Sequence, residues 1–180
     1  MRFAELELPG AFVVELDRYE DERGFFSRTW DTDEFARHGL APGVVQCSLS
    51  RNTRVGTLRG LHYQEAPYAE TKLVRCTRGA IFDVIVDLRP NSPTFTEWTS
   101  VELDAERANA LYVPKGFAHG FQTLSAEVDV FYMMSAAYVA EAAAGARWDD
   151  PAFGIAWPHT DARTISDRDA SWPDYRPPTA

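Results

Sequence analysis

The feature that most constrains the fold is an alternation of apolar and polar side chains with a period of two. In residues 80–88 (AIFDVIVDL), Phe82, Val84 and Val86 share one face of an extended chain, and Asp83 lies on the other. This period is typical of β-strands that bury at least one face. The same reasoning predicts further strands at residues 11–16, 24–29, 44–50, 58–64, 72–77, 96–103, 110–113 and 128–134.

Helix signals are clear at one place only. Asp31 can cap the free amide groups of a helix at residues 32–38, and Glu34 completes the capping pattern three residues later. A second short helix or turn is expected at 140–145. Many short strands with so few helices predict an all-β protein with a single domain, residues 1–180, folded as a closed barrel or a double-sheet jelly roll.

Charge and composition exclude several classes of protein. The net charge is −9, which argues against a protein that binds nucleic acid through phosphate attraction. The hydrophobic fraction of 45% is enough to build a sizeable core. We expect no membrane segment, because the chain lacks an apolar run of roughly 18 residues. Cys47 and Cys76 are isolated in sequence and suit a reducing compartment, so we expect a cytoplasmic protein without a signal peptide.

Two of the four histidines lie in apolar, glycine-containing segments. His62 occurs in LRGLHYQ and His119 in VPKGFAHGF, whereas His38 and His159 are expected at the surface. A single histidine in such a strand is more often a satisfied core residue, but two on neighbouring strand candidates favour a functional site. The segment 114–119 also has the P-x-G-x-x-H spacing of the second sequence motif of cupin barrels.

A metal site is not expected in this cupin-like barrel. A metal-binding cupin needs a second histidine two residues after His62 and an acidic ligand further on, but Gln64 and Lys72 occupy those places. An ammonium group repels a divalent ion, and three or four ligands are required. A metal-dependent cupin enzyme that uses His62 and His119 is the alternative from another class.

A histidine, a lysine and a tyrosine in one barrel fit proton abstraction next to a ketone. Histidine suits the role of base at neutral pH, so His62 is the candidate. Lys72 can stabilise the enolate, and Tyr132 can return a proton from the opposite face. Alternation places Arg59 and His62 on opposite faces of one strand. Both can contact one ligand only if Gly60 breaks the alternation, as a β-bulge does.

Seven segments together resemble the dTDP-4-dehydrorhamnose 3,5-epimerase family. In chain order they are DERGFF at 21–26, LRGLHYQ at 58–64, KLVRC at 72–76, FDVIVDLR at 82–89, VPKGFAHGF at 113–121, RWDDP at 147–151 and SDRD at 166–169. The resemblance implies a homodimeric double-stranded β-helix, a cupin-like jelly-roll barrel, that needs no cofactor. The implied substrate is a dTDP-linked 4-keto-6-deoxysugar, dTDP-4-dehydro-6-deoxy-D-glucose, inverted at C3 and C5 to dTDP-4-dehydro-L-rhamnose.

The resemblance also implies roles for individual residues. His62 matches the base, Asp169 the carboxylate that orients it, Lys72 the enolate-stabilising lysine and Tyr132 the acid. A carboxylate beside a histidine fixes its tautomer and increases its basicity. The implied substrate-binding residues are Asp83 and His119 deep in the site, together with Arg23, Phe26, Gln46, Ser48, Arg59, Tyr138 and Arg168.

Three positions depart from the family pattern. Ser48 replaces an asparagine, Met133 replaces a lysine and Ala143 replaces a glutamate, while the base, lysine and acid positions are unchanged. These departures leave the nucleotide base open, and also whether one carbon or both are inverted. The alternatives are a single-carbon epimerase, acting at C3 or C5 only, and a protein that binds a sugar nucleotide without catalysis.

Overall fold

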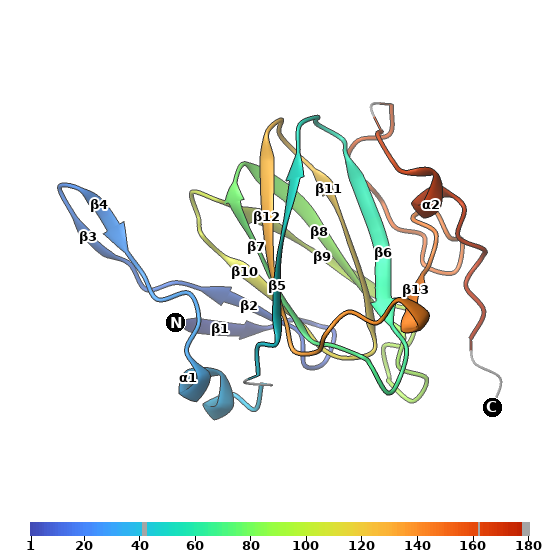
Figure 1. Cartoon of the computed structure of the whole chain (residues 1–180), viewed down its shortest axis with the longest axis horizontal. Helices are drawn as coiled ribbons and strands as arrows, with labels where there is room; N and C mark the ends of the chain where they lie inside the picture. Colours follow the sequence, from blue (N-terminus) through green and yellow to red (C-terminus); the bar gives the residue numbers. More distant parts are fainter. Residues whose placement is uncertain (41–42, 162, 178–180) are drawn as a thin grey trace.

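The computed structural model describes residues 1–40, 43–161 and 163–177, and it contains two β-sheets that face each other (Figure 1). One sheet has the strand order β1 (Arg2–Glu5), β2 (Phe12–Glu15), β10 (Ala110–Val113), β7 (Lys72–Arg78), β12 (Val128–Met134) and β5 (Gln46–Asn52). The other has the order β13 (Ala143–Gly145), β6 (Leu58–Gln64), β11 (Phe117–Thr123), β8 (Ala80–Asp87) and β9 (Trp98–Asp104). Most consecutive strands from β5 onward lie in alternate sheets, which confirms the predicted all-β jelly roll.

Every predicted strand corresponds to a strand in the structure, with ends that differ by a few residues. The largest difference is at 24–29, where only β4 (Gly24–Phe26) is extended. It pairs with β3 (Tyr19–Asp21), which the alternation does not predict, and the two form a hairpin that projects away from the barrel (Figure 1). The strands β1, β11 and β13 are also absent from the prediction. β11 is buried along its whole length between β6 and β8, so it has no polar face to reveal it.

The predicted helix is present as α1 (Thr32–Arg37). The Asp31 side chain accepts a hydrogen bond from the Glu34 amide at 3.1 Å, which confirms the cap. The expected helix or turn at 140–145 is right for its first half, the 3₁₀ turn η1 (Ala140–Ala142), and wrong for its second half, which is strand β13. A further short helix, α2 (Asp167–Ala170), is not predicted. No helix in the described part of the chain is long and apolar enough to cross a membrane.

Apolar clusters cover both sides of the central strands. Between the sheets, Val74 of β7 and Ile85 of β8 belong to one buried cluster. On the outer side of the five-stranded sheet, Val84 packs in a second cluster with Trp157 of the C-terminal segment. Helix α1 covers part of the other sheet through the buried Phe35. Both faces of β8 are therefore buried, and its residues alternate between them as predicted.

β6 and β11 approach each other closely at Gly60. A Cβ atom on Gly60 would lie 2.6 Å from the Cα atom of Gly120, and the Gly60 φ of +118° also favours glycine. The register shifts at this point, because Arg59 and His62 are three residues apart while their partners on β11 are two residues apart. The extra residue forms the bulge that the sequence requires, and Arg59 and His62 line the same cavity.

Candidate active site

The barrel contains two adjoining cavities that share His62 and Lys72 in their walls. The inner cavity has a volume of about 260 Å³, and the outer cavity has a volume of about 350 Å³. The inner cavity is lined by Ser50, Arg59, His62, Lys72, His119, Phe121 and Tyr132. Residues that line the outer cavity include Gln46, Ser48, Glu70, Tyr138, Ala143 and Arg168. Most of the residues singled out from the sequence therefore meet in one continuous region.

His62 is bonded to a buried carboxylate. Its Nε2 atom lies 2.8 Å from Oδ1 of Asp169, and the Gly60 amide donates to Oδ2 of the same carboxylate at 3.2 Å. Burial by itself raises the pKa of Asp169, but the bond and charge of His62 and the Gly60 bond outweigh it and leave the pKa lowered. The ionised carboxylate accepts a hydrogen bond from the N–H group at Nε2. In the neutral ring the free lone pair is therefore on Nδ1, where it can accept a proton.

Lys72 is held in place by two acceptors. Its Nζ atom donates to the backbone carbonyl oxygen of His62 at 3.1 Å and forms an ion pair with Glu70 at 2.9 Å. The side chains of Lys72 and Glu70 are 13% and 7% exposed. A positive charge is thereby placed beside the histidine in a partly desolvated position, where it acts more strongly than in water.

Tyr132 is on β12, in the sheet opposite the one that carries His62. Burial, and then the negative charge of Asp83, raise the pKa of the Tyr132 hydroxyl above its ordinary value, so this group holds its proton at neutral pH. The ring of His119 lies edge-on to the tyrosine ring, with centroids 6.2 Å apart. An imidazole and a protonated hydroxyl thus line the inner cavity from opposite sheets.

His119, which lines the inner cavity, forms a second pair with Asp83. Nε2 of His119 lies 2.7 Å from Oδ1 of Asp83, and both side chains are almost fully buried. Burial raises the pKa of the Asp83 carboxyl, although the charges of His119 and Lys72 act in the other direction. The second oxygen, Oδ2, is buried without a hydrogen-bond partner among the described residues.

Gln64 and Lys72, at the positions where a metal-binding cupin would have ligands, do not suit a metal ion. Gln64 donates to backbone carbonyl groups and to Glu70, and Lys72 presents an ammonium group to the cavity. Within the residues that the structure describes, no group of three or more His, Cys, Asp and Glu side chains is placed to hold a metal.

Of the two histidines expected at the surface, His38 is exposed but His159 is partly buried, because its backbone is bonded to the buried Gln122.

Comparison with known proteins gives the family. A family model described as dTDP-4-dehydrorhamnose 3,5-epimerase matches residues 5–176. The chain belongs to the dTDP-4-dehydrorhamnose 3,5-epimerase family. A curated dTDP-4-dehydrorhamnose 3,5-epimerase from Sinorhizobium fredii is 44% identical over 173 residues, which cover 96% of this chain and 89% of the relative.

Two solved structures show that members with different activities share this fold. A dTDP-6-deoxy-D-glucose-3,5-epimerase from Legionella pneumophila, in complex with dTDP-4-keto-L-rhamnose, has a TM-score of 0.90 and 36% identity, covering 95% of this chain and 90% of that one. A 3'-monoepimerase from Streptomyces bikiniensis, in complex with dTDP-quinovose, has a TM-score of 0.87 and 36% identity, covering 93% and 85%. The fold of this epimerase family therefore does not by itself determine how many carbons are inverted.

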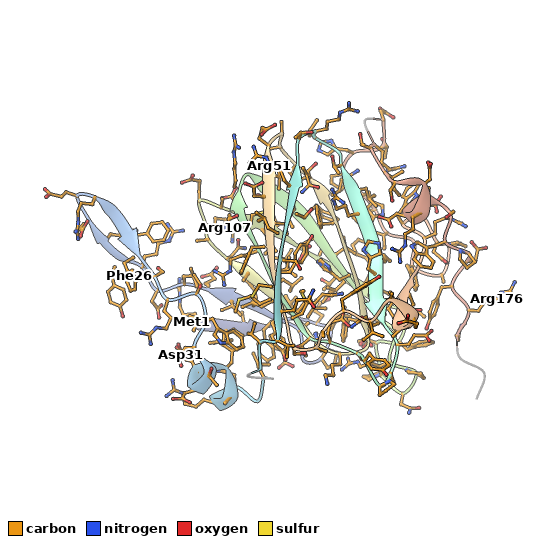
Figure 2. All side chains as sticks on the ribbon, viewed as in Figure 1. Met1, Phe26, Asp31, Arg51, Arg107 and Arg176 are labelled. Atoms are coloured by element: carbon orange, nitrogen blue, oxygen red, sulfur yellow. The ribbon has the colours of Figure 1, made fainter. Side chains whose placement is uncertain are left out.

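Two of the expected substrate-binding residues lie apart from the others. Arg23 and Phe26 are on the β3–β4 hairpin, and neither lines the inner or the outer cavity. Figure 2 shows Phe26 on this hairpin, outside the barrel. Arg23 forms an ion pair with Asp21 at the hairpin turn. Within one chain of this epimerase family member, the structure does not bring these two residues to His62.

The three departures from the family pattern occupy different surroundings. Ser48 and Ala143 line the outer cavity. Met133 instead packs against the apolar cluster under helix α1, on the outer side of the sheet, while its neighbour Met134 faces the outer cavity. The replacement at Met133 therefore does not alter the cavity wall directly.

Sequence reasoning missed several residues of the cavities. Ser50 shares a strand face with Gln46 and Ser48, so the alternation along β5 could have identified it. Phe121 is in β11, a strand that is not predicted. Glu70 precedes β7 in a loop, and no local pattern distinguishes it from other surface acids.

Proposed function

We propose that this chain inverts C3 and C5 of dTDP-4-dehydro-6-deoxy-D-glucose and so forms dTDP-4-dehydro-L-rhamnose. The observation that carries the proposal is the arrangement around the inner cavity. His62, paired with Asp169, comes from one sheet, and Tyr132 comes from the opposite sheet. Lys72 lines the same cavity. Inversion of a carbon needs a base and an acid on opposite faces, and these groups meet that requirement.

In this mechanism His62 removes a proton from a carbon next to the C4 ketone. Asp169 holds the ring and stabilises the positive charge that develops on it. Electron density moves from the broken C–H bond to the C4 oxygen, which forms an enolate. The ammonium group of Lys72 stabilises this negative charge. C3 and C5 flank the same carbonyl group, so one set of residues serves both carbons in turn.

Tyr132 then donates its proton to the opposite face of the same carbon. The enolate collapses back to the ketone, and the carbon emerges with inverted configuration. The hydroxyl is suited to this role because burial keeps it protonated until the enolate has formed. No redox change or external reactant is needed. After each inversion His62 loses its added proton to solvent and Tyr132 regains one, so that the pair can act on the second carbon and then on the next substrate.

The nucleotide fits the outer cavity. Arg168 can pair with the diphosphate, because a guanidinium group binds phosphate with two parallel hydrogen bonds. Tyr138 offers an exposed ring for base stacking, and its backbone amide is held by the Gln46 side chain at 3.0 Å. Arg59 lines the inner cavity and is anchored by Asn52 at 2.8 Å, and in our proposal it contacts the substrate where the sugar joins the diphosphate.

A homodimer would account for the position of Arg23 and Phe26. Their hairpin exposes Tyr19, Phe25 and Phe26, and large exposed aromatic residues mark interaction surfaces. In our proposal the hairpin of one subunit closes the outer cavity of the other, so that both residues contact the nucleotide bound by the partner. The net charge of −9 is compatible with binding of a diphosphate, since only a few arginines contact it in our proposal.

Product analysis tests the proposed function. The purified protein, supplied with dTDP-4-dehydro-6-deoxy-D-glucose, is expected to form dTDP-4-dehydro-L-rhamnose, identified by the NMR coupling constants of its ring protons. A product inverted at only one carbon would support the second candidate, a single-carbon epimerase, which the similarity to a 3'-monoepimerase favours. Unchanged substrate, with dTDP still bound, would contradict both and favour a binding protein.

A further inference from the structure

Glu70 lies beside the catalytic lysine but has no role in the mechanism above. Its carboxylate is almost fully buried and has two partners. Oε1 forms the ion pair with Lys72 at 2.9 Å, and Oε2 accepts a hydrogen bond from Nε2 of Gln64 at 3.1 Å. A buried carboxylate is costly unless such partners compensate for the lost water. The position of Glu70 is thus coupled to both side chains.

The orientation of Gln64 is determined by the backbone around it. Its Oε1 atom accepts from the Val139 amide at 2.6 Å, and the two N–H groups of its Nε2 atom are shared among three acceptors: the carbonyl oxygens of Tyr68 at 3.0 Å and Ala137 at 3.2 Å, and Oε2 of Glu70 at 3.1 Å. Exchanging the two ends of this amide would place like groups against each other at all of these contacts. Gln64 therefore presents an N–H donor to Glu70 and cannot present an acceptor.

These contacts require a hydrogen-bond acceptor at both terminal side-chain atoms of residue 70. One oxygen of Glu70 faces the Lys72 ammonium group, and the other faces the Gln64 N–H group. A carboxylate accepts at both oxygens, whereas an amide of the same shape accepts at one end only. Glutamine at this position would set a donor against a donor at one of the two contacts.

The network also reaches the nucleotide end of the site. Gln64 bonds to the residues on either side of Tyr138, the ring proposed to stack on the base. Lys72, at the other end of the network, touches the backbone of His62. A continuous series of hydrogen bonds thus joins the wall of the outer cavity to the ammonium group in the inner cavity.

We propose that Glu70 is a positioning residue, which, anchored by Gln64, holds the Lys72 ammonium group where the enolate oxygen forms. The inference rests on the proposed function, because it assigns Lys72 to the enolate. Glu70 itself touches neither the reacting carbons nor the C4 oxygen in this account. Its removal therefore affects the rate of proton transfer more than the binding of the nucleotide.

The test compares Glu70→Gln and Glu70→Asp with the wild-type enzyme. We expect Glu70→Gln to lower kcat by roughly 10- to 100-fold, because a misplaced catalytic group has an effect of that order. KM and the Kd for dTDP should stay within about threefold of the wild-type values, since the proposed nucleotide contacts, Arg168 and the ring of Tyr138, are unchanged. Glu70→Asp keeps two acceptor oxygens and should retain more activity than Glu70→Gln.

Glu65→Gln is the matched control, because it removes the same charge from an exposed position on the same loop. It should leave kcat unchanged. The inference is overturned if Glu70→Gln keeps at least half of the wild-type kcat, or if its thermal stability and dTDP affinity fall in parallel with kcat. It is also overturned if Glu70→Asp is no more active than Glu70→Gln. A wild-type protein with no epimerase activity would instead contradict the proposed function.

Discussion

His62 and Asp169 differ greatly in their contact with solvent. The side chain of His62 is 45% exposed and faces the cavities, while that of Asp169 is 8% exposed behind it. A base must reach the substrate, whereas the carboxylate that orients it acts best when shielded from water. Burial therefore separates the proposed base from the carboxylate proposed to support it.

The Asp169 pair predicts a particular dependence of stability on pH. Because the pKa of Asp169 is lowered in the folded protein, its stabilisation is fully present above the pKa of an unfolded aspartate, about 3.9, and is lost as the pH falls through the folded value. We expect Asp169→Asn to lower the free energy of unfolding by roughly 1–2 kcal/mol at pH 6.

Denaturant unfolding at a series of pH values tests this expectation. The difference between wild type and Asp169→Asn should shrink steadily below about pH 4. Asp167→Asn, which changes an exposed residue in the same short helix, should stay within about 0.5 kcal/mol of wild type. A difference between wild type and Asp169→Asn that grows on acidification would show that the carboxylate is not stabilised by its partners.

The β6–β11 pair is the element on which the site depends most. His62 lies directly opposite His119 in the register of these strands, and the bulge at Gly60 brings Arg59 to the same cavity. Both effects require the close approach of Gly60 to Gly120, where a Cβ atom does not fit. The catalytic geometry therefore depends on backbone packing as well as on the side chains of the site.

Gly60→Ala should accordingly be strongly destabilising. Its Cβ atom would lie within 2.8 Å of two backbone atoms, which cannot rotate away, and its φ of +118° is unfavourable for alanine. We expect a loss of at least about 3 kcal/mol in the free energy of unfolding. Gly154→Ala is the control, because Gly154 also has a positive φ, +61°, but has no atom within 4 Å of the added Cβ, so it should lose only about 1 kcal/mol. Equal losses in the two variants would show that the close approach to Gly120 adds nothing to the cost of a Cβ atom at Gly60.

The elements differ in how well the sequence predicts them. β8 is visible because Asp83 and Asp87 mark one of its faces, whereas Phe82, Val84 and Val86 form the other. The cap of α1 is visible because Asp31 and Glu34 are local in sequence. β11 is hidden because both of its faces are buried, and β13 is hidden because its AAG sequence has little strand character of its own and depends on pairing with β6.

The same distinction applies to the site. The proposed reactive residues His62, Lys72 and Tyr132 follow from the motifs, and all three line the inner cavity. Glu70 does not follow, although its partners Lys72 and Gln64 are close to it in sequence, because only the conformation of the loop before β7 brings their polar atoms to its carboxylate. Local patterns do not show which side chains of a loop turn toward the site.

Across the molecule, exposed apolar side chains gather at and next to β5, an edge strand of the six-stranded sheet. Leu49 points away from the barrel and is 63% exposed, and Val45 just before the strand is 64% exposed. The projecting hairpin adds Phe26, which is 68% exposed. Exposed apolar groups on an open strand edge favour association with another chain, in agreement with the proposed homodimer.

Leu49→Asp tests this assembly. If β5 lies in the dimer interface, a charge at Leu49 should shift the sedimentation coefficient from that of a dimer to that of a monomer. The cavities should be unaffected, because Leu49 faces outward. Val55→Asp changes an exposed apolar residue in the turn after β5 and should leave the dimer intact. A monomeric wild-type protein, or a dimeric Leu49→Asp variant, would contradict an interface at this strand.

Hydrogen exchange at C3 and C5 of the sugar distinguishes double epimerisation from inversion of a single carbon. Proton NMR would follow dTDP-4-dehydro-6-deoxy-D-glucose in heavy water with the wild-type protein and with His62→Ala. We predict that wild type removes the signals of both H3 and H5, and that His62→Ala lowers both rates by at least about 100-fold while its melting temperature is unchanged. Exchange at wild-type rates in His62→Ala would contradict the role of His62, and exchange at one carbon only would contradict double epimerisation.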